Sequence, residues 1–300
     1  MKHSVPIFVV GGTGRHGGTG RMVVRSLLDR LIPVRALART RDDRADDLEK
    51  LGAEVVIGDL TDRQRLIAAL YGIETAYFTY PIAGGIIEAA ASFASAARSA
   101  GVKRVVVMSM APATPMSPSH LGRAQWLAEE IIGFSGVQCL SLRIAGVFFE
   151  NIELLHRSEI KSDRAILNAF TDIPVNWLAG EDVARFAVEA LVHPEKFGDQ
   201  TAVYPGSPEP YTQSQVAAAI SDFLGESVRH RTISQSEWHD RILELTKHDV
   251  RISRDMAGHI SAVAAHLKEP FKPNDLIAEI TGTPPMSLTD ALNSGVIKLT

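Results

Sequence analysis

Glycine fills six of the ten positions from 11 to 20, between an apolar run and a helical pattern. Glycine permits a tight turn and lets the backbone approach a pyrophosphate closely. The start of the following helix supplies unpaired N–H groups and the positive end of its dipole. Strand, glycine loop and helix in this order are what a dinucleotide-binding fingerprint requires. The alternative interpretation is an ordinary glycine-rich turn.

The spacing of these glycines leaves two registers open. Counted from the strand, the triplet is Gly11, Gly14 and Gly17, whereas counted back from the helix it is Gly14, Gly17 and Gly20. The loop therefore holds about three residues more than the fingerprint needs. The cofactor-binding residues expected in it are Gly11, Thr13, Gly14, Arg15, His16, Gly17 and Gly20.

A cation follows the second predicted strand. NAD-binding sites usually place an acid there for the ribose 2′-hydroxyl. This chain has Arg39, with Arg41 and Arg44 close behind. Arginine can hold a 2′-phosphate in a bidentate manner, so we expect NADP(H), bound by Arg39 and Arg44, with Arg15 as a further cation. The alternative is a solvated basic start to the next helix.

Two later loops complete the expected cofactor site. Asp59 and Leu60 follow the third strand and should lie beside the adenine. Asp59 or Thr61 could also cap the next helix, and both interpretations can hold together. Tyr80 and Pro81 follow the fourth strand and should lie near the nicotinamide. Tyr80 would stack on the ring or donate a proton there, or else only form a wall of the pocket.

Catalytic groups are less well marked. Four places after the five tyrosines stand Thr75, Pro81, Gly84, Pro208 and Gln215, so the chain has no Tyr-x-x-x-Lys pair. In such a pair the lysine lowers the pKa of the tyrosine that protonates a carbonyl. His120 is a candidate proton donor or a surface histidine. Ser109 ends the fifth strand, where ligands of α/β sheets bind, or bonds its own backbone.

The elements that position these residues alternate regularly. The sequence predicts strands at 5–10, 34–38, 55–57, 75–79, 104–108 and 137–142. It predicts helices between them at 21–31, 42–51, 63–71, 85–98 and 121–134. The strands carry unbroken apolar runs, which are typical of strands covered on both faces. We therefore expect an α/β fold with a doubly wound parallel (Rossmann) sheet.

The rhythm changes after about residue 146. We expect a dinucleotide-binding domain over 1–150, to which 178–195 returns, and a smaller, mostly helical substrate-binding lobe over 151–300. Further helices are predicted at 148–161, 180–191 and 214–224. Phe148, Phe149 and Trp177 either line an apolar substrate cavity or belong to the core.

Composition excludes several other classes of protein. The 300 residues hold 31 Lys and Arg against 35 Asp and Glu, which argues against a nucleic-acid binder held by a basic field. The single cysteine, Cys139, cannot form an internal disulfide, and the ten histidines show no metal-site spacing. The chain contains no run of about 18 uncharged apolar residues, so we expect no transmembrane helix. Residues 1–6 lack the features of a signal peptide, so we expect a cytoplasmic protein.

Several segments together resemble a known family. They are GGTG at 11–14, VRALAR at 34–39, GAEVVIGDL at 52–60, LRIAGVFFEN at 142–151, EDVA at 181–184 and EITGTPP at 279–285. This pattern is similar to atypical short-chain dehydrogenases/reductases of the NmrA-like group. The resemblance implies NADPH-dependent reduction of quinones, phenylpropanoid-type ethers or dyes, or a redox-sensing regulator without demonstrated catalysis. It also places Gln125 where the group often has lysine or histidine, and Ser109 at its serine position.

Two functional hypotheses remain. The preferred one is an NADPH-dependent oxidoreductase that transfers a hydride to a small apolar carbonyl or quinone-type substrate, with Ser109, His120, Gln125 and Tyr80 as the catalytic residues. Gln125 cannot act as an acid, but it can donate a hydrogen bond to a carbonyl or to the nicotinamide ribose. The alternative is a non-catalytic NADP(H)-binding sensor that acts through a protein partner. A homodimer through helices of the dinucleotide domain is expected by analogy of fold.

Overall fold

The chain folds into two compact units. The computed structural model describes residues 5–14, 18–270 and 272–299. Unit 1 comprises Met1–Met116, Leu121–Ile144 and Ala184–Tyr204. Unit 2 comprises Ser117–His120, Ala145–Val183 and Pro205–Thr300. Each unit is therefore built from segments that are separate in the sequence.

Unit 1 contains a seven-stranded parallel sheet in the order β10-β6-β5-β4-β1-β2-β3. Its strands are β1 (Ile7–Val10), β2 (Val34–Ala38), β3 (Glu54–Ile57), β4 (Thr75–Phe78), β5 (Arg104–Met110), β6 (Gln138–Ile144) and β10 (Ala202–Val203). Chain order reverses between β1 and β4, and ligands of open α/β sheets bind at such a switch point. The predicted fold class is confirmed.

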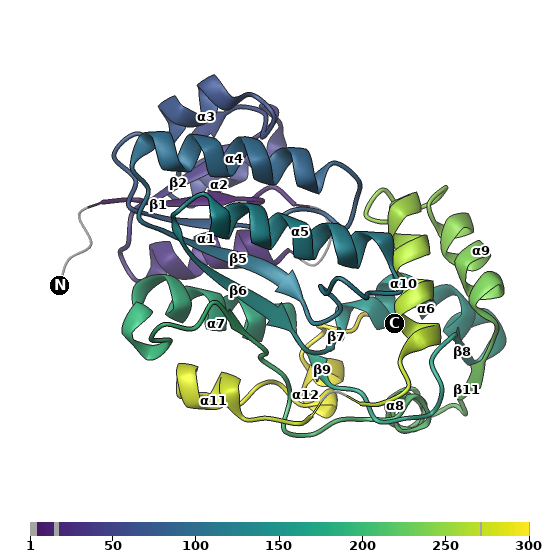
Figure 1. The fold of residues 1–300 in the computed structure, drawn as a ribbon. Coiled ribbons are helices and arrows are strands. Elements are labelled where there is room, and N and C mark those ends of the chain that lie inside the picture. The colour runs from purple at the N-terminus through teal and green to yellow at the C-terminus, as the bar shows by residue number, and fades with distance from the viewer. Residues whose placement is uncertain (1–4, 15–17, 271, 300) are drawn as a thin grey trace. The chain divides into compact units, whose positions relative to one another are not determined.

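Helices cover both faces of this sheet. They are α1 (Thr19–Asp29), α2 (Asp43–Lys50), α3 (Arg63–Ala69), α4 (Ile86–Ala100), α5 (His120–Phe134) and α7 (Gly180–Val192), followed by the 3₁₀ helix η1 (Pro194–Lys196). Buried side chains of α3, α4 and α5 pack on one face, against residues such as Phe8, Phe78 and Val107. Figure 1 shows α1 and α7 on the opposite face. Strands buried on both sides explain the unbroken apolar runs.

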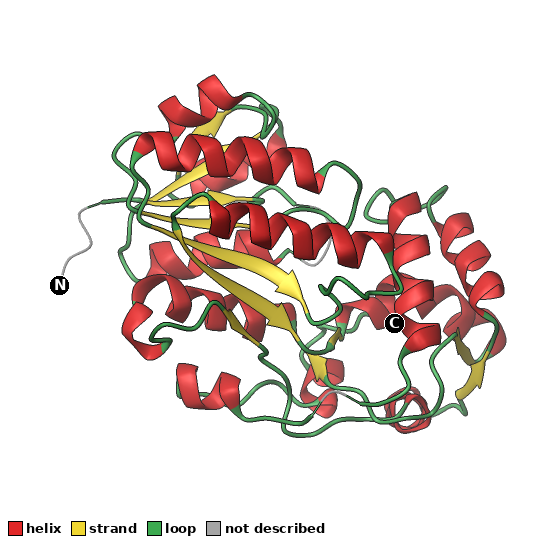
Figure 2. Ribbon diagram, viewed as in Figure 1, coloured by secondary structure: helices red, strands yellow, loops and turns green. Residues whose placement is uncertain are grey.

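Unit 2 is mostly helical (Figure 2). Its helices are α6 (Glu150–Asp163), α8 (Gln213–Leu224), α9 (Gln235–Leu245), α10 (Arg254–His266), α11 (Leu276–Thr281) and α12 (Leu288–Asn293). Two small parallel sheets join β8 (Ala165–Asn168) to β11 (Arg229–Thr232) and β7 (Val147–Phe148) to β9 (Trp177–Leu178). A continuous cluster of buried apolar side chains forms the core of this unit.

Several element boundaries differ from the sequence predictions. The first helix begins at Thr19 rather than at residue 21, and α6 begins at Glu150 rather than at residue 148. Within the described part of the chain, no helix is both long and apolar enough to cross a membrane.

Candidate functional site

Gly11 and Gly20 form the two ends of the glycine loop. Gly11 has φ +83°, and a Cβ there would lie 2.3 Å from the Cγ2 atom of Thr79. A Cβ on Gly20, in the first turn of α1, would lie 2.4 Å from the carbonyl oxygen of Gly11. Only glycine fits at either position, and α1 thereby approaches the end of β1 closely. Glycine is therefore required at Gly11, which begins one of the two registers, and at Gly20, which ends the other.

The start of α1 has features that favour the binding of an anion. Its N-cap residue is Gly18, with φ +61°, and in the described chain no side chain caps the helix and no acid lies in its first turn. Unpaired N–H groups and the helix dipole therefore favour a negatively charged ligand at this end. Gly14 N–H donates to the Gly11 carbonyl at 3.0 Å and closes a turn after β1.

Thr13 is held in place from the neighbouring helix. Its carbonyl accepts a hydrogen bond of 2.6 Å from Nη1 of Arg44, whose Nε donates to Asp42 at 3.2 Å. Arg44 therefore supports the loop rather than presenting a free cation. Arg15, His16 and Gly17 lie outside the described residues, and their expected roles remain predictions.

The three arginines after β2 differ in their partners. Arg41 forms ion pairs with Glu49 at 2.6 Å and with Asp46 at 3.6 Å. Arg39 is exposed and makes no hydrogen bond or ion pair with any residue that the structure describes. Arg39 is therefore the arginine of this group that is available to a ligand.

Asp59 forms a turn after β3. Its Oδ1 accepts hydrogen bonds from the backbone N–H of Thr61 at 2.9 Å and from the Thr61 hydroxyl at 2.7 Å. These bonds hold the pKa of Asp59 below its usual value, and the charge of Arg39 acts in the same direction. The capping interpretation is wrong, because Asp62 is the residue that caps α3. Leu60 is half-buried and packs against the core between the sheet and α3 to α5.

Tyr80 follows β4 and is half-buried. Its hydroxyl donates to the carbonyl of Gly84 at 3.2 Å. Burial raises the pKa of Tyr80, the Asp59 carboxylate raises it further and Arg39 opposes the shift. The charges of Arg39 and Asp59 therefore both reach Tyr80 at the carboxyl edge of the sheet. Pro81, the next residue, is exposed.

Ser109 lies near the end of β5 in a chain of polar contacts that the sequence did not predict. Its hydroxyl donates to Oε1 of Glu129 on α5 rather than to its own backbone. The other oxygen of Glu129 accepts a hydrogen bond from Nε of Arg143 on β6 at 2.9 Å and forms an ion pair with Nη2 at 2.8 Å. Nη1 of Arg143 donates to the hydroxyl of Tyr204 at 2.7 Å.

Gln125 lies one helical turn before Glu129 on the same face of α5. It is 4% exposed, and its Nε2 lies 3.5 Å from the carbonyl oxygen of Met108. Gln125 and Glu129 thus contact successive residues of β5. The i, i+4 spacing of two polar side chains on an otherwise apolar helix face was the signal in the sequence.

His120 belongs to unit 2, whereas the other predicted catalytic residues lie in unit 1. It is the exposed first residue of α5. The neighbouring Ser119 hydroxyl lies 2.8 Å from Nδ1 of His259 on α10, and both side chains are buried. Burial lowers the pKa of His259 to about 4, and His120 contributes to this shift.

Two of the proposed cavity aromatics are core residues. Phe149 and Trp177 stack with ring centroids 5.9 Å apart and are at most 3% exposed within the apolar cluster of unit 2. Phe148 is half-buried. No group of three or more potential metal ligands occurs among the described residues.

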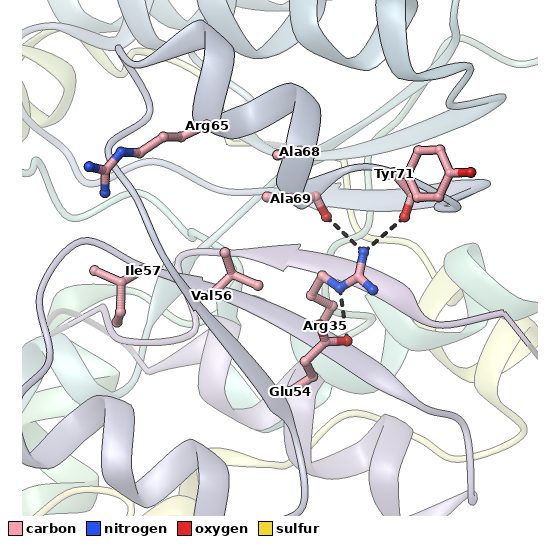
Figure 3. Close-up of a pocket in the computed structure, with 8 residues that line it drawn as sticks. All are labelled: Arg35, Glu54, Val56, Ile57, Arg65, Ala68, Ala69 and Tyr71. Atoms are coloured by element: carbon pink, nitrogen blue, oxygen red, sulfur yellow. Dashed lines mark hydrogen bonds and ion pairs between the residues drawn. The ribbon is translucent and has the colours of Figure 1, made fainter.

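A pocket of about 400 Å³ lies elsewhere in unit 1, between α3 and strands β2 and β3. Figure 3 shows Arg35 in it. The guanidinium donates to the carbonyls of Ala69 and Tyr71, each at 2.9 Å, and pairs with Glu54 at 2.8 Å. Arg35 and Glu54 stand at the opposite end of their strands from Arg39 and Asp59, so this pocket is separate from the glycine loop.

Comparison with known proteins agrees with this arrangement. The family model described as the NmrA-like family matches residues 3–275. The chain belongs to the NmrA-like family. A curated relative, the NAD(P)H azoreductase of Xenophilus azovorans, is 32% identical over 231 residues, which are 76% of this chain and 77% of the relative.

Solved structures of two reductases share the fold. The NADPH-dependent quinone oxidoreductase of Escherichia coli, complexed with NADPH, superposes with a TM-score of 0.80 at 22% identity, covering 97% of this chain and 99% of that one. Triphenylmethane reductase of Citrobacter sp., complexed with NADP(H), gives 0.78 at 22% identity, with coverages of 96% and 99%.

Proposed function

We infer that this NmrA-like protein is an NADPH-dependent reductase that transfers a hydride to a small apolar carbonyl or quinone-type acceptor. The observation that carries this inference is Arg39, which is exposed and has no hydrogen-bond or ion-pair partner among the described residues. It directly follows β2, the strand that pairs with β1. A guanidinium binds a phosphate group in a bidentate manner, and NADPH differs from NADH by the 2′-phosphate.

The residues of the loop fit a dinucleotide. Gly11 and Gly20 leave no room for a Cβ, so the start of α1 lies close to the end of β1, as the glycines of a dinucleotide-binding fingerprint require. The N-terminus of α1, which no described side chain caps, would hold the phosphates, and Arg39 would hold the 2′-phosphate. Arg44 contributes indirectly, because it fixes the carbonyl of Thr13. NADPH, when bound, supplies the hydride.

The relatives support the class of acceptor. Their names describe reductases of azo compounds, quinones and triphenylmethanes, and two of their structures were solved with NADPH or NADP(H). A quinone suits a site without a Tyr-Lys pair, since its reduced oxygens can take protons from water. Tyr80, Ser109, His120 and Gln125 remain the predicted catalytic residues, and the cytoplasmic location and the homodimer also remain predictions.

A single pair of measurements tests this function. NADPH oxidation is followed by absorbance with a panel of quinones, azo dyes, enones and aromatic ketones, and NADPH binding is followed by fluorescence titration. Turnover with a quinone or an azo dye is the expected result. Binding without any turnover would favour the non-catalytic sensor, and the absence of binding would contradict the cofactor assignment.

A further inference from the structure

Ser109 and Glu129, at the end of β5, differ in their ability to donate the proton of the hydrogen bond between them. Glu129 is 5% exposed, and its Oε2 accepts a hydrogen bond from Nε of Arg143 and forms an ion pair with Nη2 of the same arginine. A carboxylate paired with arginine in this way has no proton to donate. The hydrogen bond between Ser109 and Glu129 must therefore use the proton of the serine hydroxyl.

The direction of this hydrogen bond limits what Ser109 can offer to a ligand. Ser109 is itself 5% exposed, and its one O–H is committed to Glu129. It can accept a further hydrogen bond, but it cannot donate one to the oxygen of a carbonyl or a quinone.

Gln125, unlike Ser109, can still donate a hydrogen bond to a ligand. Its amide carries two N–H groups, and the contact with the Met108 carbonyl, at 3.5 Å, uses at most one of them. Among the described residues, no acceptor is found for the other N–H. A buried N–H without an acceptor is costly, and a ligand acceptor atom at the carboxyl edge of the sheet would satisfy it.

We propose that Glu129 is a positioning residue that fixes Gln125 as the hydrogen-bond donor to the acceptor atom of the substrate and removes Ser109 from that role. Glu129 ties α5 to β5 through Ser109 and to β6 through Arg143. Gln125, one turn earlier on the same helix face, is thereby held at the end of β5. This inference rests on the proposed reductase function.

The first test compares Gln125→Met with Ser109→Ala. Menadione is titrated into the complex with NADP⁺, with tryptophan fluorescence as the readout, and kcat for menadione reduction is measured with NADPH. Gln125→Met removes the donor at nearly constant volume and should weaken menadione binding and lower kcat at least tenfold. The Kd for NADPH should change less than threefold. Ser109→Ala should cause a smaller loss of kcat than Gln125→Met.

The second test asks whether Glu129→Gln raises or lowers kcat when it is added to Gln125→Met. In Glu129→Gln the amide oxygen must face Arg143, so the amide N–H₂ faces Ser109 and frees the serine proton. The double variant Gln125→Met/Glu129→Gln should therefore recover kcat at least threefold over Gln125→Met. Adding Ser109→Ala should abolish this recovery. Merely structural damage by Glu129→Gln would lower kcat further instead of restoring it.

The outcomes separate the inference from the proposed function. Wild-type protein that oxidises no NADPH with any acceptor would overturn both. Active wild-type protein whose Gln125→Met variant binds and reduces menadione normally would overturn the inference alone. So would a double variant without recovery, provided that its melting temperature shows it to be folded.

Discussion

Gly20 packs so closely on Gly11 that a methyl group on Gly20 would lie 2.4 Å from the Gly11 carbonyl oxygen. Real Cβ atoms do not approach backbone oxygen this closely, so the start of α1 or the end of β1 would have to move. The two glycines are nine positions apart, and the contact fixes both ends of the loop that lies between them.

Gly20→Ala should therefore weaken NADPH binding at least tenfold and lower the melting temperature. Alanine is normally better than glycine within a helix by about 1 kcal/mol, so a loss of stability would show that the clash dominates. Fluorescence titration and thermal unfolding measure the two effects. Gly258→Ala on α10 is the matched control, because a Cβ there meets no atom within 4 Å and should stabilise the protein. Normal NADPH binding by Gly20→Ala would contradict the role of this contact.

Arg39→Ala should discriminate between the two nicotinamide cofactors. A hydrogen bond to a charged group contributes about 1.5–3 kcal/mol, so the Kd for NADPH should rise roughly 10- to 100-fold. The Kd for NADH should change about twofold or less. Arg41→Ala is the control, since Arg41 is already paired with Glu49 and Asp46. Equal losses for NADPH and NADH would exclude Arg39 as the 2′-phosphate ligand.

His259 should make the folded protein sensitive to mild acid. Burial lowers its pKa from 6.5 to about 4, so between these values the unfolded chain binds more protons than the folded one. The stabilisation is complete above pH 6.5 and is lost as the pH falls toward 4. At about 1.4 kcal/mol per pH unit, roughly 2 kcal/mol is lost between pH 6.5 and 5.

Urea unfolding at pH 7 and pH 5 tests this dependence. His259→Asn cannot titrate and should lose less stability over that interval than the wild type, by about the amount above. His248→Asn removes an exposed histidine and serves as the control. Identical pH dependence in wild type and His259→Asn would show that His259 does not govern it.

Cys139 should be unreactive in the folded protein. Burial raises the pKa of its thiol to about 12, and the thiolate is the reactive form. Labelling with an aromatic disulfide reagent at pH 8 should be slow for native protein and complete within minutes in concentrated urea. Rapid labelling of the native protein would mean that β6 opens readily.

Much of unit 1 could be predicted from the sequence, because parallel strands covered on both faces leave long apolar runs. The strands of unit 2 could not. β11 consists of Arg229, His230, Arg231 and Thr232, and it is paired on one side only, so no apolar pattern marks it. β8 is equally short, and its partner lies more than sixty residues away.

The candidate site divides in a similar way. Arg39 and the glycines could be proposed from the sequence because each of these two signals lies within a single short loop. Glu129 and Arg143 were missed as a pair, since their contact joins a helix to a strand and depends on burial. The loop register was also undecidable from spacing alone, because the close approach of Gly20 to Gly11 exists only in the folded chain.

The division of unit 1 into three segments constrains the order in which the protein can be made. Its seventh strand, β10, pairs with β6 but is encoded some sixty residues later, after α7 and η1. Glu189 on α7 also pairs with Arg30 from the end of α1, at 2.7 Å. The sheet of unit 1 can therefore be completed only after the ribosome has released Val203. A nascent chain that stalls at residue 150 would present an open sheet edge to chaperones and proteases.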